Sequence, residues 1–220
     1  MAHNLVRKGG IPALAYSTSD AASVSSCSLI IRHSEPHMQA TISLQFSVPI
    51  HGFDDDQSFT LLYDADNLVP GTNSLGPATV SLPQARLDEI SRQGNPKPRA
   101  LSLTLKKPCP VRCPPSSGSV APKHGFDSRF RQLVDLARAT EVHILFDYNW
   151  LHRDYHAQFQ RLINRPERLT GFRAGNSHTT LYRQADWTVF SPVEEAVSEA
   201  PPSYTNASNK RSRQGKFLST

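Results

Sequence analysis

The sequence predicts an α+β fold, in which an antiparallel meander of strands is followed by a helix, a strand and a second helix. Two observations support this prediction. Apolar and polar residues alternate with period two in the first half, whereas apolar residues recur at helical spacing after residue 126. One polar face on each strand indicates an antiparallel sheet covered on one side, not the doubly buried sheet of a nucleotide-binding α/β fold. We expect a single domain over residues 27–192, with a disordered arm at 1–26 and a disordered tail at 193–220.

Five segments of the first half have the composition of strands. Residues 40–48 alternate without exception, with five apolar side chains on one face and four polar ones on the other. Residues 78–82 and 101–105 alternate in the same way, and residues 28–31 and 59–63 are short apolar-rich runs. Period-two alternation is typical of a strand with one buried face. This half is therefore expected to form the meander.

One short helix is expected to interrupt the strands. Pro83 stands where the first turn of a helix accepts proline, and Gly94 can end the helix. Leu87 and Ile90 lie three residues apart between them, which is helical spacing. Prolines then recur, so residues 108–122 are expected to form an extended or poorly ordered connection.

The period becomes that of a helix after this connection. Asp127 or Ser128 can cap a helix whose apolar stripe avoids its three arginines. Residues 142–146 then form a compact apolar run, which predicts a buried strand.

The last part of the domain is expected to contain the second helix. Apolar residues at three-and-four spacing predict this helix over residues 151–162, and it must end before Pro166. Leu181 and residues 187–190 then suggest one or two closing strands.

The positive charge of the chain is unevenly distributed. The formal net charge is +5, but residues 34–96 carry two basic and eight acidic residues (−6) and residues 97–173 carry fourteen and six (+8). The basic stretch suggests association with nucleic acid or another polyanion. Acidic and basic parts of one domain can also complement each other, and this second interpretation is the one we favour.

No metal or cofactor site is indicated by the sequence. Cys109 and Cys113 stand in a proline-rich segment, and zinc would need two further ligands. Together with Cys27 they are expected to be reduced thiols. The acidic groups at 54–56 and 64–67 lack the Gly and Glu of a calcium loop. Neither a Walker loop, a Gly-rich dinucleotide fingerprint nor a G-x-S-x-G elbow is present.

An enzyme would have to use a constellation without a recognised pattern. His152 and His156 are four residues apart, which can place two imidazoles on one metal, but Arg153 replaces the Glu of the zinc-protease pattern. We therefore favour solvent-facing histidines. Asp147 ends the predicted buried strand close to His152, where catalytic groups often lie. It can equally cap the turn into the next helix.

The tail contains a short proline motif. Pro201, Pro202 and Tyr204, with one residue between the second proline and the tyrosine, resemble the PPxY ligand of WW domains. Such domains bind a preformed polyproline turn in an aromatic groove. The resemblance implies recruitment by WW-domain proteins, including ubiquitin ligases.

The end of the tail is basic. Lys210, Arg211 and Arg213 belong to the last twenty residues, which carry four positive charges and no acidic residue. This stretch resembles a short nuclear-import signal, which would be read by an import receptor, or a weak polyanion contact. A basic end without a function is an equal alternative.

Neither a membrane span nor a secretory signal is predicted. No stretch approaches the roughly 18 consecutive apolar residues of a membrane helix, and residues 1–10 lack the apolar core of a signal peptide. We therefore expect an intracellular protein, nuclear or cytoplasmic, with no membrane partner.

Three stretches of the chain show a family resemblance. Residues 123–151, 185–192 and 201–213 resemble a family of filamentous-fungal proteins of unknown function. The resemblance spans most of the expected domain, and it implies no activity, fold or site residue.

The leading functional hypothesis is a non-enzymatic protein-interaction module that carries a PPxY-like ligand and a basic targeting stretch. The first alternative is a protein that associates with nucleic acid or another polyanion through residues 97–173. The second is an enzyme with its site near Asp147, His152 and His156.

Overall fold

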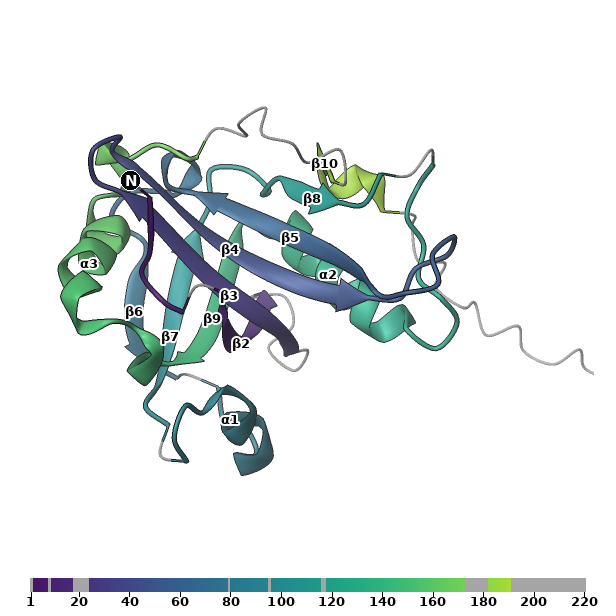
Figure 1. Ribbon diagram of the computed structural model, residues 1–220, viewed down its shortest axis with the longest axis horizontal. Helices are drawn as coiled ribbons and strands as arrows, with labels where there is room; N and C mark the ends of the chain where they lie inside the picture. Colours follow the sequence, from purple (N-terminus) through teal and green to yellow (C-terminus); the bar gives the residue numbers. More distant parts are fainter. Residues whose placement is uncertain are drawn as a thin grey trace, which may run out of the picture.

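A ten-stranded antiparallel sheet dominates the described part of this computed structural model (Figure 1). The structure describes residues 2–7, 9–17, 24–78, 80–94, 96–115, 118–172 and 182–190. The strands are β1 (His3–Asn4), β2 (Ile11–Ser17), β3 (Ser25–Ser34), β4 (Gln39–Val48), β5 (Gln57–Asp64), β6 (Ser74–Pro77), β7 (Pro98–Thr104), β8 (Val111–Cys113), β9 (Glu141–Asp147) and β10 (Arg183–Ala185). The α-helices are α1 (Gln84–Ile90), α2 (Asp127–Arg138) and α3 (His156–Asn164), and the 3₁₀ turns are η1 (Ala65–Asn67), η2 (Tyr148–Trp150), η3 (Arg153–Tyr155), η4 (Pro166–Arg168) and η5 (Trp187–Val189).

The strand order across the sheet is β10-β8-β5-β4-β3-β2-β9-β7-β6, and β1 pairs with β3 beside this path. Strands β2 to β5 are therefore a meander of sequential neighbours. The register places apolar residues opposite one another, as in the buried row Ile11, Leu29, Leu44 and Leu61. Such cross-strand pairs stabilise the register, because a slip by one residue would turn each side chain to the other face.

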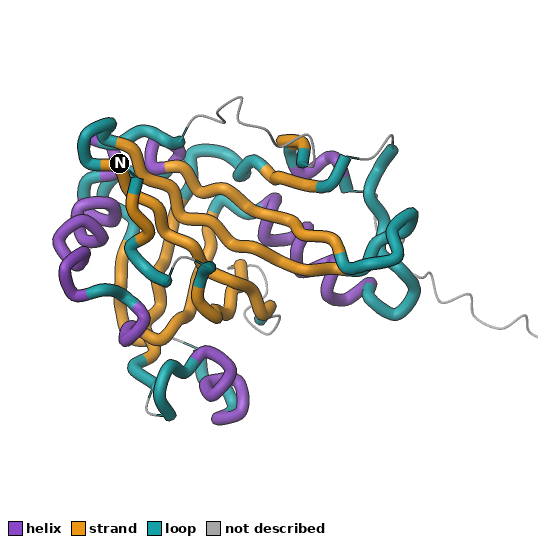
Figure 2. Tube along the Cα trace, viewed as in Figure 1, coloured by secondary structure: helices purple, strands orange, loops and turns teal. Residues whose placement is uncertain are grey.

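The sheet is strongly bent, and the main core lies on its inner face. Figure 2 shows β3, β4 and β5 running at an angle to β6, β7 and β9. Helices α2 and α3 lie at opposite ends of the sheet in this view (Figure 1). Phe130 of α2 packs edge-on against Phe190 at 5.4 Å between ring centroids, and Phe159 of α3 packs edge-on against Phe146 at 6.3 Å. Each helix thus contributes its buried apolar stripe to one core.

A smaller core covers part of the outer face. Leu14, Leu145 and Ala100 are adjacent across β2, β9 and β7, and Ile90 of α1 packs on them. The expectation of a sheet covered on one side is therefore corrected, since three of its strands bury side chains on both faces.

The broad fold prediction is confirmed, because the described residues form a mixed α and β domain dominated by an antiparallel sheet. The helices predicted after Pro83 and after Phe126 form, as do the strands predicted at residues 40–48, 101–105 and 142–146. The connectivity differs from a meander followed by a separate unit. Strand β9 inserts between β2 and β7, so the late strand joins the centre of the sheet.

The prediction of a disordered arm over residues 1–26 is wrong for the segment that forms β1 and β2. Strand β2 is central, with β3 on one side and β9 on the other. It lacks a period-two pattern because Ala13 faces the main core and Leu14 faces the smaller core. Pro12, which has no N–H to donate, precedes the residues of β2 that pair with β9.

Three further predictions require correction. Residues 78–82 form no strand in their described part, and Ala78 and Leu82 pack instead on the smaller core. The connection at 108–122 contains β8 and is partly buried, since β8 pairs with β5. Residues 187–189 form the turn η5, and the closing strand is β10.

The second predicted helix begins late, because residues 153–155 form η3 before α3 starts at His156. Leu181 and the predicted tail at 193–220 lie outside the described residues. None of the helices in the described ranges is long and apolar enough to span a membrane.

Candidate functional site

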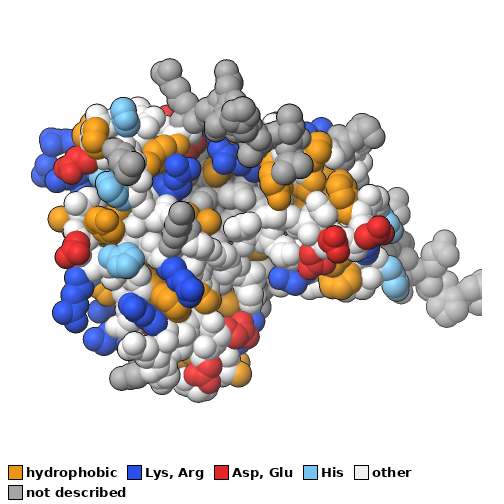
Figure 3. Space-filling model, viewed as in Figure 1, with side chains coloured by type: hydrophobic (Ala, Val, Ile, Leu, Met, Phe, Trp, Pro, Cys, Tyr) orange, Lys and Arg blue, Asp and Glu red, His pale blue; other side chains and the backbone are white. Residues whose placement is uncertain are grey.

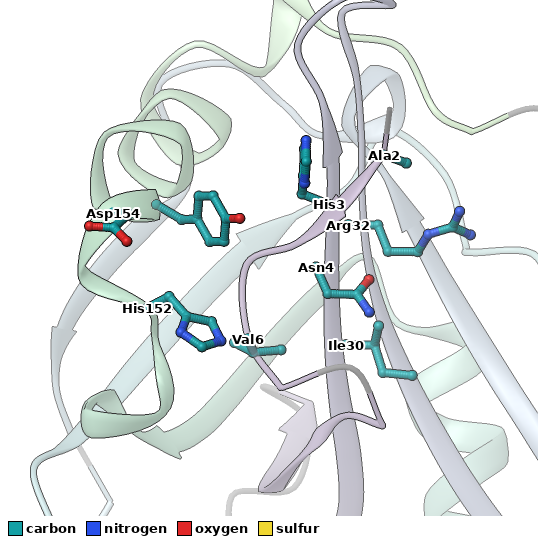
Figure 4. Close-up of a pocket in the computed structure, with 9 residues that line it drawn as sticks. Ala2, His3, Asn4, Val6, Ile30, Arg32, His152 and Asp154 are labelled. Atoms are coloured by element: carbon teal, nitrogen blue, oxygen red, sulfur yellow. The ribbon is translucent and has the colours of Figure 1, made fainter.

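Two adjoining hollows lie near the start of α3, and His152 lines both of them. The first, here called the N-terminal hollow, has a volume of about 690 Å³ and lies between β1, β3 and η3. The second, here called the basic hollow, has a volume of about 650 Å³ and lies between the loop after α1 and the segment from η2 to α3. Figure 4 shows the N-terminal hollow, with His3, Asn4 and Arg32 on the strand side and His152 on the opposite side.

Cationic and protonatable side chains surround the basic hollow. Arg92 and Lys97 come from the loop between α1 and β7, and His152, Arg153 and His156 come from the segment that leads into α3. No Asp or Glu belongs to this lining among the described residues. Figure 3 shows several Lys and Arg side chains at the lower left of the view, below the position of α3 in Figure 1.

The buried carboxylate of Asp147 holds the two walls of the basic hollow together. Its Oδ2 accepts a hydrogen bond from the backbone N–H of Arg92 (2.9 Å), and its Oδ1 accepts from those of Lys97 (2.9 Å) and Asn149 (3.0 Å). Asp147 is 0% exposed. Burial alone would raise the pKa of this carboxyl, but the three backbone donors outweigh it and lower the pKa below its usual range. The ionised side chain therefore fixes the loop that carries Arg92 and Lys97.

Two further contacts fix the Arg92 side chain. Its Nη1 donates to the carbonyl oxygen of Asn149 at 2.6 Å, and its guanidinium lies over the Trp150 ring at 5.4 Å from the centroid. The indole Nε1 of Trp150 donates in turn to the carbonyl oxygen of Ile90 at 3.0 Å. Arg has five N–H donors, and the hydrogen bond to Asn149 uses one of them. These contacts therefore hold the side chain and leave most of its donors for another acceptor.

The two histidines are held by different contacts. The ring of His156 packs against Tyr148 at 5.1 Å between centroids, with the tyrosine hydroxyl 3.5 Å from Nδ1. The ring of His152 packs edge-on against Tyr155 at 5.9 Å, and its backbone N–H donates to the carbonyl oxygen of Leu5 at 3.2 Å. His156 is the first residue of α3, so the positive end of the helix dipole borders the basic hollow.

The N-terminal hollow differs in chemistry. One cation and one carboxylate line it, Arg32 and Asp154, so its formal charge is zero with neutral histidines. Three partly exposed rings belong to it, those of His3, His152 and Tyr155. The His3 and Tyr155 rings are 6.1 Å apart between centroids and tilted by 33°.

The structure divides the residues of the predicted basic region. Lys97 and Arg153 reach the basic hollow, whereas Arg129 and Arg131 are exposed on α2 at the other end of the sheet (Figure 1). Arg92 lies outside the 97–173 stretch, and sequence reasoning missed it. Its position two residues after α1 places it at the loop, but only tertiary contacts, those of Asp147 and of Arg92 with Asn149 and Trp150, bring that loop to η2.

The histidines named from the sequence do come together at one site. His152 and His156 both line the basic hollow, and His152 is exposed while His156 is half-buried. Asp147 lines neither hollow, and backbone N–H groups donate to both of its carboxylate oxygens.

The motifs of the tail lie outside the described residues. This holds for the PPxY-like residues Pro201, Pro202 and Tyr204, and for the basic residues Lys210, Arg211 and Arg213. The interaction and targeting predictions therefore remain predictions from sequence.

The cysteines named from the sequence are not joined by disulfides. Burial raises the pKa of Cys109 to about 12 and also raises the pKa of Cys27, so both are held as thiols. Cys113 is buried as well, and all three are free. Within the described ranges, no group of three or more His, Cys, Asp or Glu side chains is placed to hold a metal ion.

A comparison of this chain with protein-family models, with curated proteins and with solved structures finds no match.

Proposed function

We propose that this protein binds a phosphate-bearing anion in the basic hollow. The observation that carries the proposal is the convergence of Arg92, Lys97 and Arg153 with two histidines around one hollow whose described lining contains no carboxylate. These residues come from two segments about 55 positions apart in the chain, which the buried Asp147 joins.

The charge balance at this site favours an anion. Arg92, Lys97 and Arg153 give three positive charges, and the buried carboxylate of Asp147 subtracts one, which leaves +2 with neutral histidines. Three backbone N–H groups already donate to the two oxygens of Asp147. A unit charge about 4 Å from one of these cations gains roughly 1 to 4 kcal/mol at the effective dielectric constants of a protein surface.

The donor types suit phosphate in particular. The guanidinium fork of Arg can hold two oxygens of one phosphate, and Lys supplies a compact charge with three donors. The hydroxyl of Tyr148 and the amide of Gln93 also line the hollow and can hydrogen-bond the remaining oxygens.

Calorimetric titration with sodium tripolyphosphate at 50 mM NaCl tests the proposal. Lys97→Gln combined with Arg153→Gln removes two charges from exposed side chains and is expected to weaken binding about tenfold or more. The matched control is Arg129→Gln combined with Arg131→Gln, which removes the same charge from α2 and should leave binding within about twofold. Equal weakening by both pairs would show a general charge effect and contradict a site in the basic hollow.

Recruitment through the tail is a separate proposal, supported by the sequence. We propose that Pro201, Pro202 and Tyr204 bind a WW-domain protein, which would make the chain a protein-interaction module as well. Capture of the full chain on a panel of WW domains should be lost with Tyr204→Ala and kept with Ser203→Ala, because the serine occupies the variable position of the motif. Equal capture of both variants would exclude the PPxY interaction.

A further inference from the structure

The two hollows adjoin at His152. This side chain lines both, and the neighbouring Tyr155 packs against it in the wall of the N-terminal hollow. Each volume, about 690 and 650 Å³, is within the range of a site for a drug-sized ligand. A single phosphate group fills only a small part of this surface, so a ligand that uses both hollows has to be an extended molecule.

The two hollows offer complementary chemistry along this surface. The basic hollow carries a formal charge of +3 in its lining, whereas the N-terminal hollow is formally neutral and presents partly exposed rings. The ring of Tyr155 on η3 and the ring of His3 on β1 both belong to this lining, with 6.1 Å between their centroids. Charged groups in one hollow are thus followed by imidazole and phenol rings in the next.

We infer that the ligand is single-stranded nucleic acid, with phosphates bound in the basic hollow and an unpaired base stacked on Tyr155 in the N-terminal hollow. This inference rests on the proposed function. Proteins that bind single strands combine a positive groove for the backbone with aromatic rings on which bases stack. Bases in a duplex are stacked on one another and cannot reach a side-chain ring. A ligand of phosphate alone would leave the rings of the N-terminal hollow unused.

Fluorescence anisotropy with a labelled oligothymidylate of eight nucleotides tests the inference on the full chain. The tail charges are first removed by Lys210→Gln, Arg211→Gln, Arg213→Gln and Lys216→Gln, so that the tail does not contribute to the signal. In this background we compare Tyr155→Leu, which keeps an apolar side chain against the core, with Tyr155→Phe, which keeps the ring.

Tyr155→Leu is expected to weaken oligothymidylate binding by about fivefold or more, because one stacked base is lost. Tyr155→Phe should bind within about twofold of the parent, and neither variant should change the affinity for tripolyphosphate. Thermal unfolding of each variant shows whether the fold is kept. His3→Ala is a second variant, which removes another ring of the same hollow at an exposed position away from the core of the sheet.

The outcomes separate the inference from the proposed function. If oligothymidylate binding is unchanged in both Tyr155→Leu and His3→Ala while Lys97→Gln with Arg153→Gln weakens it, the base site is overturned and the anion site stands. Equal affinity for an oligothymidylate–oligoadenylate duplex or for polyphosphate of the same charge would also overturn it. If neither tripolyphosphate nor the oligonucleotide binds, the proposed function itself fails.

Discussion

Asp147→Asn tests the idea that a buried carboxylate assembles the candidate site. The substitution keeps the shape of the side chain but removes its charge and one of its two acceptor oxygens. In the wild-type protein Oδ2 accepts a hydrogen bond from the N–H of Arg92, and Oδ1 accepts from those of Lys97 and Asn149. In its best orientation the asparagine keeps the bonds at Oδ1 and presents an amide donor to the N–H of Arg92.

The expected loss of unfolding free energy follows from these contacts. One charge-assisted hydrogen bond contributes about 1.5 to 3 kcal/mol, and it is lost with two donors left facing each other. The two remaining bonds become neutral and weaker, while the relief of burying a charge offsets part of the loss. We therefore expect a destabilisation of about 3 kcal/mol. With a urea dependence of about 2 kcal/mol/M, the unfolding midpoint should fall by about 1.5 M.

Urea unfolding followed by tryptophan fluorescence measures this change, and its pH dependence adds a second test. The pKa of Asp147 is lower in the folded protein than its ordinary value of 3.8, so the carboxylate contributes stability that is present above pH 3.8 and is lost as the pH falls below it. The difference between wild type and Asp147→Asn should therefore shrink below about pH 4.

Asp154→Asn is the matched control, because this exposed carboxylate on η3 undergoes the same chemical change. It should alter the unfolding free energy by less than about 0.5 kcal/mol. Two results would refute the anchoring role of Asp147. One is a urea midpoint for Asp147→Asn within 0.3 M of wild type, which corresponds to about 0.6 kcal/mol. The other is a difference in unfolding free energy that does not depend on pH.

Three further predictions concern the core and its pH dependence. Desolvation is the chief cause that lowers the pKa of the buried His33 in the folded protein. The unfolding free energy should therefore fall as the pH drops below about 6.5, by at most about 1.4 kcal/mol per pH unit. Urea titrations at pH 7.5 and 5.5 should show a smaller change for His33→Gln than for the wild-type protein. Gly171→Ala would place a Cβ 2.5 Å from Cγ of Asp64, so it should lower the unfolding free energy, measured by thermal unfolding, by about 1 to 3 kcal/mol. Gly76→Ala is the control, because its Cβ would have no atom within 4 Å, and it should lower the unfolding free energy by less than about 0.5 kcal/mol. The Cys109 thiol has a pKa of about 12, so at pH 8 it should react with iodoacetamide on the order of 10³-fold more slowly than an exposed thiol. In urea-unfolded protein, mass spectrometry should show Cys109 alkylated at the rate of an exposed thiol.

Periodicity alone identified much of the secondary structure. Residues 40–48 form β4 because alternating apolar side chains can bury only one face of an extended chain. The helix α2 follows from its apolar stripe, and Phe130 and Leu133 on that stripe are fully buried. Such patterns are local, so they are visible without knowledge of the partner elements.

The same reasoning failed where a segment is buried on both faces or contributes few pairs. Strand β2 places Ala13 and Leu14 in different cores, which removes the alternation on which the prediction depends. Strand β8 spans only Val111–Cys113 between prolines and is extended because β5 and β10 pair with it. Pairing energy from distant residues decides such segments.

The candidate site shows the same division between sequence and structure. The sequence by itself determined the types of side chain available, including the histidine pair at positions 152 and 156 and the basic residues around them. Only the tertiary structure selected Arg92, Lys97 and Arg153 and left the arginines of α2 at the far end of the sheet. The physical reason is that the hydrogen bonds of Asp147 and the stacking of Arg92 on Trp150 join segments more than 50 residues apart, and no local pattern records such contacts.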